Sequence, residues 1–220
     1  MASASQAVLT VSGLEVSYLR SPKRFAYPDI TVERGQCVCI SGSTGCGKTT
    51  LLNSLFQPAF RGEVNYKEAM LLAKDVRSYG PAIYSVMSYM PQYAQDGLNP
   101  MMDVGAQIQA VLEGNGLELS SPELEKNLGR LGLNPDILKL FPHQMSGGMK
   151  QRLVLLMAYL KKAALMVLDE PSSAIDALTL RSMLDFLKEI KSEGIALVIV
   201  SHDLGFTRHI ADISIMLESC

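Results

Sequence analysis

Long hydrophobic runs are missing from this 220-residue chain. The longest, Leu153 to Leu160, ends at two lysines and falls far short of the roughly 18 apolar residues that a membrane-spanning helix needs. Residues 1–10 also lack the basic start and the apolar stretch of a secretion signal. We therefore expect the chain itself to be soluble and cytoplasmic.

A charge excess of either sign is missing too. The chain has 20 Lys and Arg residues against 22 Asp and Glu residues, so its net charge of −2 offers no global electrostatic basis for binding nucleic acid. The four cysteines form no C-x-x-C pair, which argues against a zinc or disulfide framework. Cys37 and Cys39 are expected to share one face of a strand and to pack as small apolar residues.

Repeats and low-complexity segments are also absent from the chain. Hydrophobic residues make up 48% of it and charged residues 19%, which excludes a disordered chain. Its length is enough to bury a substantial core, and it predicts one domain or one core with an inserted subdomain.

Three short apolar runs organise the chain, at residues 37–40, 164–168 and 195–200. Each is continuous rather than alternating, which is typical of a parallel strand covered on both faces, although the period alone does not exclude a buried helix. Polar residues follow each run at once, at 41–45, 169–170 and 201–203. Because ligands bind beyond the carboxyl ends of the strands in open α/β sheets, these segments predict one shared site.

Helical patterns occupy much of the second half. Apolar residues recur at helical spacing from Leu180 to Ile190, and Gly194 fits the residue just past the helix end. This helix is expected to connect two parallel strands. Asp103 and the pair Ser121-Pro122 are typical helix starts, so residues 103–162 are interpreted as an all-helical insertion.

A glycine-rich segment follows the first apolar run. Residues 42–49 fit the pattern G-x-x-x-x-G-K-[ST] and precede a helical run. Glycines let successive backbone N–H groups face a phosphate, and the positive end of the following helix points at the same anion. Lys48 supplies a mobile charge for the β- and γ-phosphates, and the Thr49 hydroxyl can ligate Mg²⁺. The alternative is a glycine-rich turn with an incidental lysine. The residues expected to bind nucleotide here are Gly42, Ser43, Thr44, Gly45, Cys46, Gly47, Lys48, Thr49 and Thr50.

An acidic pair ends the second apolar run. Asp169 lies at the predicted strand end, where it can hold Mg²⁺ directly or through water. Glu170 can accept a proton from an attacking water, and general-base help of this kind is worth roughly 10²–10⁴-fold in rate. Two carboxylates alone are equally well explained as a solvated strand end. A phosphate-binding loop in the same chain favours the metal-binding interpretation.

Together these patterns predict an α/β fold. Its P-loop nucleotide-binding core has a mainly parallel sheet, an N-terminal antiparallel β region and an inserted all-helical subdomain. Alternating apolar residues between Ala7 and Tyr66 predict the antiparallel strands. We expect residues 1–92 and 161–220 to form the two parts of the nucleotide-binding core, and residues 93–160 to form the helical subdomain with the signature motif described next.

Further motifs carry a family resemblance. The segment Ser146-Gly147-Gly148-Met149-Lys150-Gln151-Arg152, upstream of Leu168-Asp169-Glu170-Pro171, resembles the signature of ATP-binding cassette (ABC) ATPases. Gln92 resembles the Q-loop glutamine, and His202 resembles the switch histidine. Residues 173–176, Ser173-Ala174-Ile175-Asp176, resemble the D-loop of the family. Tyr18 stands where the family has an aromatic residue that stacks on adenine. These landmarks occur in the family's order over nearly the whole chain.

A narrower resemblance concerns the residues around these landmarks. Residues 89–92, residues 98–100 with Val104, and residues 141–149 are similar to the oligopeptide, dipeptide and nickel importer branch. In that branch a methionine commonly replaces the last glutamine of the signature, as Met149 does here.

The resemblance implies a role for each landmark. ATP and Mg²⁺ are the implied cofactors, and the signature of one subunit closes on the ATP that the P-loop of another subunit holds. The implied catalytic residues are Glu170, His202 and Gln92. The implied metal ligands are Thr49, Gln92 and Asp169. The implied nucleotide contacts outside the P-loop are Tyr18, Ser146, Gly147, Gly148, Met149 and Asp176. Asp176 equally suits a plain helix N-cap, and Tyr18 a packing residue.

The resemblance implies the ATP-binding and ATP-hydrolysing subunit of an ABC importer for peptides, nickel or a metal chelate. Its implied partners are a second, same or related ATPase subunit, transmembrane permease subunits and, indirectly, an extracytoplasmic substrate-binding protein, with no nucleic acid. The chain would then lie peripherally on the cytoplasmic face of the cell membrane. Alternatives are an ABC-type ATPase of a soluble enzyme complex, a P-loop kinase for a small molecule, and a DNA-repair ABC ATPase, whose long coiled-coil insertion has no room here.

Overall fold

A computed structural model describes residues 7–18, 23–173 and 176–218. Ala174 and Ile175 of the predicted D-loop lie outside the described residues, as do residues 1–6 and Cys220. Within the described ranges, the strands form one sheet of five strands and two smaller sheets of four and three strands.

The five-stranded sheet is parallel throughout, with the order β12-β5-β11-β10-β9. Its strands are β5 (Cys37–Gly42), β9 (Met87–Met90), β10 (Leu165–Asp169), β11 (Ala196–Val200) and β12 (Ile213–Leu217). The three apolar runs of the sequence become the adjacent strands β5, β11 and β10, which confirms that prediction. Their carboxyl ends therefore meet at one edge of the sheet.

Both faces of this sheet are covered. Every residue of β10 and β11 is buried. Along β10, Met166 and Leu168 pack into an apolar cluster with the large helices, whereas Leu165 and Val167 pack into a second cluster with α1 (Lys48–Phe56) and the antiparallel strands. Burial on both faces is the reason that these runs are continuous rather than alternating in the sequence.

Cys37 and Cys39 share one face of β5, as their spacing predicts. Both side chains are buried, and the two Sγ atoms lie 3.7 Å apart. The hydrogen bond with Cys39 and the burial raise the pKa of the Cys37 thiol, so it stays protonated at neutral pH. In the described ranges, no three His, Cys, Asp or Glu side chains cluster as metal ligands.

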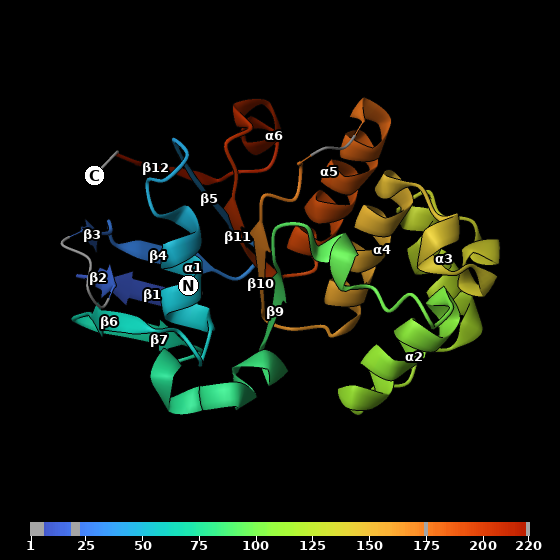
Figure 1. Ribbon diagram of the computed structural model, residues 1–220, viewed down its shortest axis with the longest axis horizontal. Coiled ribbons are helices and arrows are strands. Elements are labelled where there is room, and N and C mark those ends of the chain that lie inside the picture. The colour runs from blue at the N-terminus through green and yellow to red at the C-terminus, as the bar shows by residue number, and fades with distance from the viewer. Residues whose placement is uncertain (1–6, 19–22, 174–175, 219–220) are drawn as a thin grey trace, which may run out of the picture.

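The antiparallel strands lie on one side of the parallel sheet, where Figure 1 shows them in blue and cyan around α1. The first small sheet has the order β4-β1-β7-β8, and the second has the order β3-β2-β6. The strands are β1 (Ala7–Ser12), β2 (Glu15–Tyr18), β3 (Arg24–Ala26), β4 (Ile30–Glu33), β6 (Gly62–Asn65), β7 (Glu68–Leu71) and β8 (Lys74–Asp75). Antiparallel pairing of these strands confirms the prediction made from the alternating N-terminal stretches.

The larger helices gather on the other side of the molecule (Figure 1). They are α2 (Val104–Gly114), α3 (Ser121–Arg130), α4 (Gly147–Leu160) and α5 (Ala177–Ser192), and the short α6 (Leu204–Arg208) follows β11. Short 3₁₀ segments are η1 (Val76–Ser85), η2 (Ala94–Gly97), η3 (Pro135–Lys139) and η4 (Pro142–Gln144). Among the described helices, none has both the length and the apolar character for crossing a bilayer. The division at residues 92 and 160 stays a prediction.

The helix starts follow the sequence signals, with one difference. Asp103 is the N-cap of α2, where its Oδ1 accepts a hydrogen bond of 2.7 Å from the Ala106 N–H. Ser121, predicted as a cap, is instead the first residue of α3, and Ser120 is the N-cap. Because a proline fits either of the first two helical positions, whose N–H groups have no partner inside the helix, Pro122 does not fix the start to one residue.

Candidate active site

The phosphate-binding loop connects the carboxyl end of β5 to the first turn of α1. Its turn is closed by a hydrogen bond of 3.3 Å from the Cys46 N–H to the Ser43 carbonyl. The Lys48 ammonium donates to the Gly42 carbonyl at 2.7 Å and to the Ser43 carbonyl at 3.0 Å. A positive charge is therefore held within the curl of the loop, next to the N-terminus of a helix that favours anions.

Asp169, at the carboxyl end of β10, faces the start of α1. The Thr49 hydroxyl donates to Asp169 Oδ2 at 3.3 Å, so the structure brings the loop and the acidic pair together. Burial raises the pKa of Asp169 to about 6, which the Thr49 hydrogen bond opposes and the charge of Glu170 reinforces. Asp169 Oδ1 is buried without a hydrogen-bond partner among the described residues. A carboxylate oxygen of this kind beside a hydroxyl suits a hard cation such as Mg²⁺.

Glu170 has an unusual backbone. Its φ of +51° lies in the left-handed region, which costs a residue with a side chain about 1–3 kcal/mol, and a hydrogen bond of 2.8 Å from its N–H to the Val200 carbonyl fixes it. Its buried carboxylate lies 2.8 Å from His202 Nδ1 and also accepts from the His202 backbone N–H at 3.3 Å. The strained turn therefore aims the carboxylate at the histidine of the neighbouring strand end.

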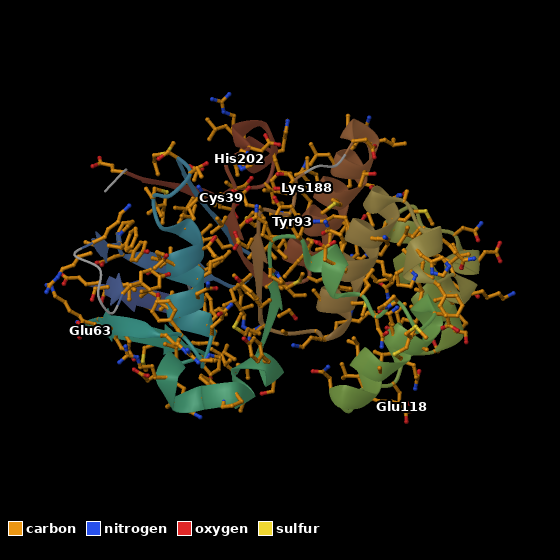
Figure 2. All side chains as sticks on the ribbon, viewed as in Figure 1. Cys39, Glu63, Tyr93, Glu118, Lys188 and His202 are labelled. Atoms are coloured by element: carbon orange, nitrogen blue, oxygen red, sulfur yellow. The ribbon has the colours of Figure 1, made fainter. Side chains whose placement is uncertain are left out.

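These elements surround a cavity of about 280 Å³. His202, labelled in Figure 2, lies just past the carboxyl end of β11 at this edge of the parallel sheet. The residues that line the cavity are Phe25, Thr44, Gly45, Gly47, Lys48, Thr49, Thr50, Gln92, Glu170 and His202. All except Phe25 were singled out from the sequence. Gln92 reaches this site from the segment after β9.

Tyr18 lies next to the cavity and does not line it. Its hydroxyl is 3.0 Å from Thr50 Oγ1, and its ring packs at a tilt against Phe60 with 5.5 Å between the centroids. The Tyr18 side chain is 38% exposed. Cys46 is buried at the base of the loop, and its Sγ is 4.0 Å from the Lys48 ammonium nitrogen.

The signature residues begin α4, away from this cavity. Ser146 is the N-cap, and its Oγ accepts a hydrogen bond of 3.2 Å from the Met149 N–H. Gly147 and Gly148 form the first helical positions, so their N–H groups belong to the unsatisfied set at the helix start. None of these four residues lines the cavity in this chain. They form a second cluster, at the N-terminus of α4.

Asp176 belongs to this second cluster. It is the N-cap of α5, where Oδ1 accepts from the backbone N–H groups of Leu178 at 3.0 Å and Thr179 at 2.9 Å. These hydrogen bonds lower the pKa of Asp176, and the bond from the Thr179 N–H has the largest effect. A Cβ added at Gly148 would lie 2.7 Å from Thr179 Oγ1 and 3.4 Å from Asp176 Oδ2. The signature glycine is therefore packed against the helix that follows the predicted D-loop.

Sequence reasoning missed three residues around the site. Phe25 lines the cavity, and the Tyr27 hydroxyl donates to the Gly47 carbonyl at 2.9 Å. Neither belongs to a motif, because both lie in the alternating N-terminal region. Gln151 is buried and its Nε2 donates to the Pro171 carbonyl at 3.0 Å, which joins α4 to the segment after Glu170. Its position within the signature could have marked Gln151 as a site residue, although no role was assigned to it.

The same fold occurs in solved ABC ATPase structures. One, described as the structure of an ATP binding subunit of an ABC transporter, has a TM-score of 0.79 and 21% sequence identity over 96% of this chain and 86% of that chain. The architecture is thus the α/β cassette fold of ABC ATPases. A model of the ABC transporter family matches residues 27–173, and the chain belongs to this family.

Curated relatives are similar along most of this chain. The dipeptide transport ATP-binding protein DppD of Caldanaerobacter subterraneus is 33% identical over 79% of this chain and 57% of its own length. The oligopeptide transport ATP-binding protein OppD of Lactococcus lactis is 29% identical over 84% of this chain and 58% of its own length. The chain therefore spans a little over half the length of these relatives. Others at 28% and 29% identity are named for glutamine transport and L-cystine import.

Proposed function

We propose that this chain binds ATP and hydrolyses it to power an ABC importer. The observation that carries the proposal is the contact of 3.3 Å between the Thr49 hydroxyl and Asp169 at the edge of the parallel sheet, with the Glu170–His202 pair on the same cavity. A phosphate loop, a carboxylate suited to a cation and a second carboxylate for proton transfer are the groups that phosphoryl transfer to water requires.

The loop and α1 would bind the phosphates. The Lys48 ammonium supplies a charge-assisted hydrogen bond, and the N–H groups at the start of α1 supply further donors. Thr44, Gly45 and Thr50 line the same cavity as Lys48. Tyr18, which is bonded to Thr50 and partly exposed, is proposed to contact the adenine.

Thr49, Asp169 and Gln92 are the proposed holders of Mg²⁺. The unpartnered Oδ1 of Asp169 and the hydroxyl of Thr49 are hard oxygen donors, which this ion prefers, so the residues present fit the ion. When bound, Mg²⁺ would neutralise phosphate charge. Because only the ionised carboxylate is an effective ligand, the raised pKa of Asp169 predicts that metal binding strengthens as the pH rises through about 6.

Glu170 is the proposed general base. Its carboxylate takes a proton from the attacking water as the water oxygen bonds to the γ-phosphorus and the bond to the ADP oxygen breaks. His202 Nδ1, 2.8 Å from Oε2, would hold this carboxylate in place. Rigid placement by the left-handed turn at Glu170 would reduce the reorganisation that the reaction requires.

The second cluster is proposed to act on another subunit. Ser146, Gly147, Gly148 and Met149 carry helix N-terminal donors but do not line the cavity of their own chain, and Asp176 packs beside them. A phosphate held by a second ATPase subunit would satisfy these donors. Two ATP molecules between two subunits then favour a closed pair, and hydrolysis reopens it.

Transmembrane permease subunits are the proposed further partners, and an extracytoplasmic binding protein would deliver the substrate to them. The helical part, residues 93–160, and the loop from Gln92 to Pro100 would contact the permease at the cytoplasmic face of the membrane. Tyr93, labelled in Figure 2, is 56% exposed within this loop. The names of DppD and OppD support peptides as the cargo.

The test compares wild-type chain with Glu170→Gln for phosphate release from MgATP. We expect the variant to bind ATP normally and to lose about 10²- to 10⁴-fold in rate, because the amide cannot accept the proton. Glu118→Gln, an exposed carboxylate on the helical part, is the control and should keep the wild-type rate. Wild-type rates in Glu170→Gln would contradict the assignment. Copurification with membrane permease subunits, rather than with soluble proteins alone, tests the importer proposal.

A further inference from the structure

The peptide between Gly47 and Lys48 is held by two donors. Gly47 is the N-cap of α1, and its φ of +99° lies in the region that favours glycine. Its carbonyl accepts the Leu51 N–H at 2.9 Å, which is the first bond of the helix, and also the Tyr27 hydroxyl at 2.9 Å. Both acceptor positions of this carbonyl are therefore used.

Tyr27 is itself rigidly fixed. It lies between β3 and β4, its side chain is 7% exposed, and its N–H donates to the Leu14 carbonyl at 2.9 Å. Its ring stacks on that of Phe25, with 6.3 Å between the centroids and 10° between the planes. Contacts with Leu14 and Phe25, which both lie outside α1, therefore hold the Tyr27 side chain in place.

The side chains of Phe25 and Tyr27 also pack closely around Gly47. A Cβ added there would lie 2.5 Å from Phe25 Cδ1 and 2.8 Å from the Tyr27 hydroxyl oxygen. Real Cβ atoms do not approach other atoms so closely, so this wall leaves the Gly47 peptide little room to rotate. The hydrogen bond and the packing therefore restrain the same peptide from the same side.

Restraint of this carbonyl sets the direction of a donor. In a trans peptide the C=O of one residue and the N–H of the next point in opposite directions. Because the Gly47 carbonyl points into the helix, the Lys48 N–H points out of the helix N-terminus. That N–H is one of the four that an α-helix leaves unsatisfied, and both Gly47 and Lys48 line the cavity.

We propose that Tyr27 is a positioning residue for the phosphates, because its hydroxyl fixes the Gly47 carbonyl and thereby aims the Lys48 backbone N–H at the bound anion. This inference rests on the proposed function and adds to it a residue outside every motif of the chain. Tyr27 touches no phosphate itself. Its contribution is to remove freedom from the loop before binding, so that less conformational entropy is lost when the anion binds.

The test is Tyr27→Phe in the full chain, with Tyr79→Phe as the matched control. Tyr79 also donates its hydroxyl to a backbone carbonyl, that of Leu71, at 2.9 Å, but it lies in η1 and does not line the cavity. Each variant loses a hydrogen bond from a tyrosine hydroxyl to a backbone carbonyl, and both are expected to lose similar thermal stability. Only Tyr27→Phe is expected to weaken ATP binding, by about 2- to 10-fold in calorimetry, the effect of one hydrogen bond.

A second measurement reports on the donor itself. Backbone amide hydrogen exchange of Lys48 in the ATP complex should be faster in Tyr27→Phe than in the wild type, and unchanged in Tyr79→Phe. A merely structural role would lower the melting temperature without changing either readout. Equal ATP affinity in Tyr27→Phe and wild type, or equal loss in the two variants, overturns the inference. Failure of the wild type to bind ATP would instead overturn the proposed function.

Discussion

Asp169 is expected to make the stability of this protein fall as the pH rises. Burial raises its pKa from an ordinary 3.8 to about 6. Between these values the folded chain binds the proton more tightly than the unfolded chain, so the free energy of unfolding decreases with pH. At about 1.4 kcal/mol for each pH unit of this interval, the total approaches about 3 kcal/mol, and it is fully developed above the folded pKa.

Replacing Asp169 with asparagine removes this titration and leaves the shape of the side chain. We expect Asp169→Asn to unfold in urea much like the wild type near pH 4, and to be more stable by up to about 3 kcal/mol near pH 8 in the presence of a chelator. The measurement is the difference between the two unfolding free energies across this range, followed by circular dichroism. Taking the difference removes the titration of the shared groups that do not interact with residue 169.

A control variant and a measurement with Mg²⁺ complete this experiment. Glu118→Gln, which changes an exposed carboxylate, should leave the difference from wild type constant with pH. Mg²⁺ added at pH 8 should narrow the gap, because it stabilises only the protein that keeps the ionised carboxylate. A stability difference that is the same at pH 4.5 and pH 8 would refute the claim that burial governs the ionisation of Asp169.

Two other predictions follow from the loop and the signature. Lys48→Ala should weaken ATP binding at least about 10-fold in calorimetry, because a charge-assisted phosphate contact is lost; unchanged affinity would contradict the role of Lys48. Gly148→Ala should lower stability by about 1–3 kcal/mol, because its Cβ would lie 2.7 Å from Thr179 Oγ1. Gly147→Ala should be neutral or gain up to about 1 kcal/mol from helix propensity, because among the described residues only its own helix and chain neighbours lie within 4 Å of the added Cβ. Equal melting temperatures for the two alanine variants would show that the packing against α5 has no effect.

The sequence was most informative where local pattern and tertiary burial agree. The apolar runs that become β5, β10 and β11 are continuous because both faces of the sheet are covered. These three strands and the edge that their carboxyl ends share could therefore be predicted. The phosphate-binding loop could also be predicted, because glycines and a lysine at this spacing are typical of a loop that binds phosphate between a strand and a helix.

Other features depend on contacts that no local pattern encodes. The Tyr27 hydroxyl meets Gly47 only because the segment between β3 and β4 lies against the N-terminus of α1, and a tyrosine near an alternating strand is commonplace. The left-handed backbone at Glu170 occurs in a residue type that gives no warning of it. The start of α3 at Ser121 rather than after it was also undetermined, since two serines precede Pro122 and either can be the N-cap.

The strand order has a consequence for the synthesis of this chain. Strand β5 leads directly into the phosphate-binding loop, yet both of its neighbours, β11 and β12, lie within residues 196–217. Asp212 also accepts a hydrogen bond of 2.7 Å from the Cys37 N–H, across 175 positions of sequence. On the ribosome, both edges of β5 therefore stay unpaired until residues 196–217 have emerged. Nascent fragments that end before residue 196 should bind chaperones and should gain protease resistance only when β11 and β12 become available.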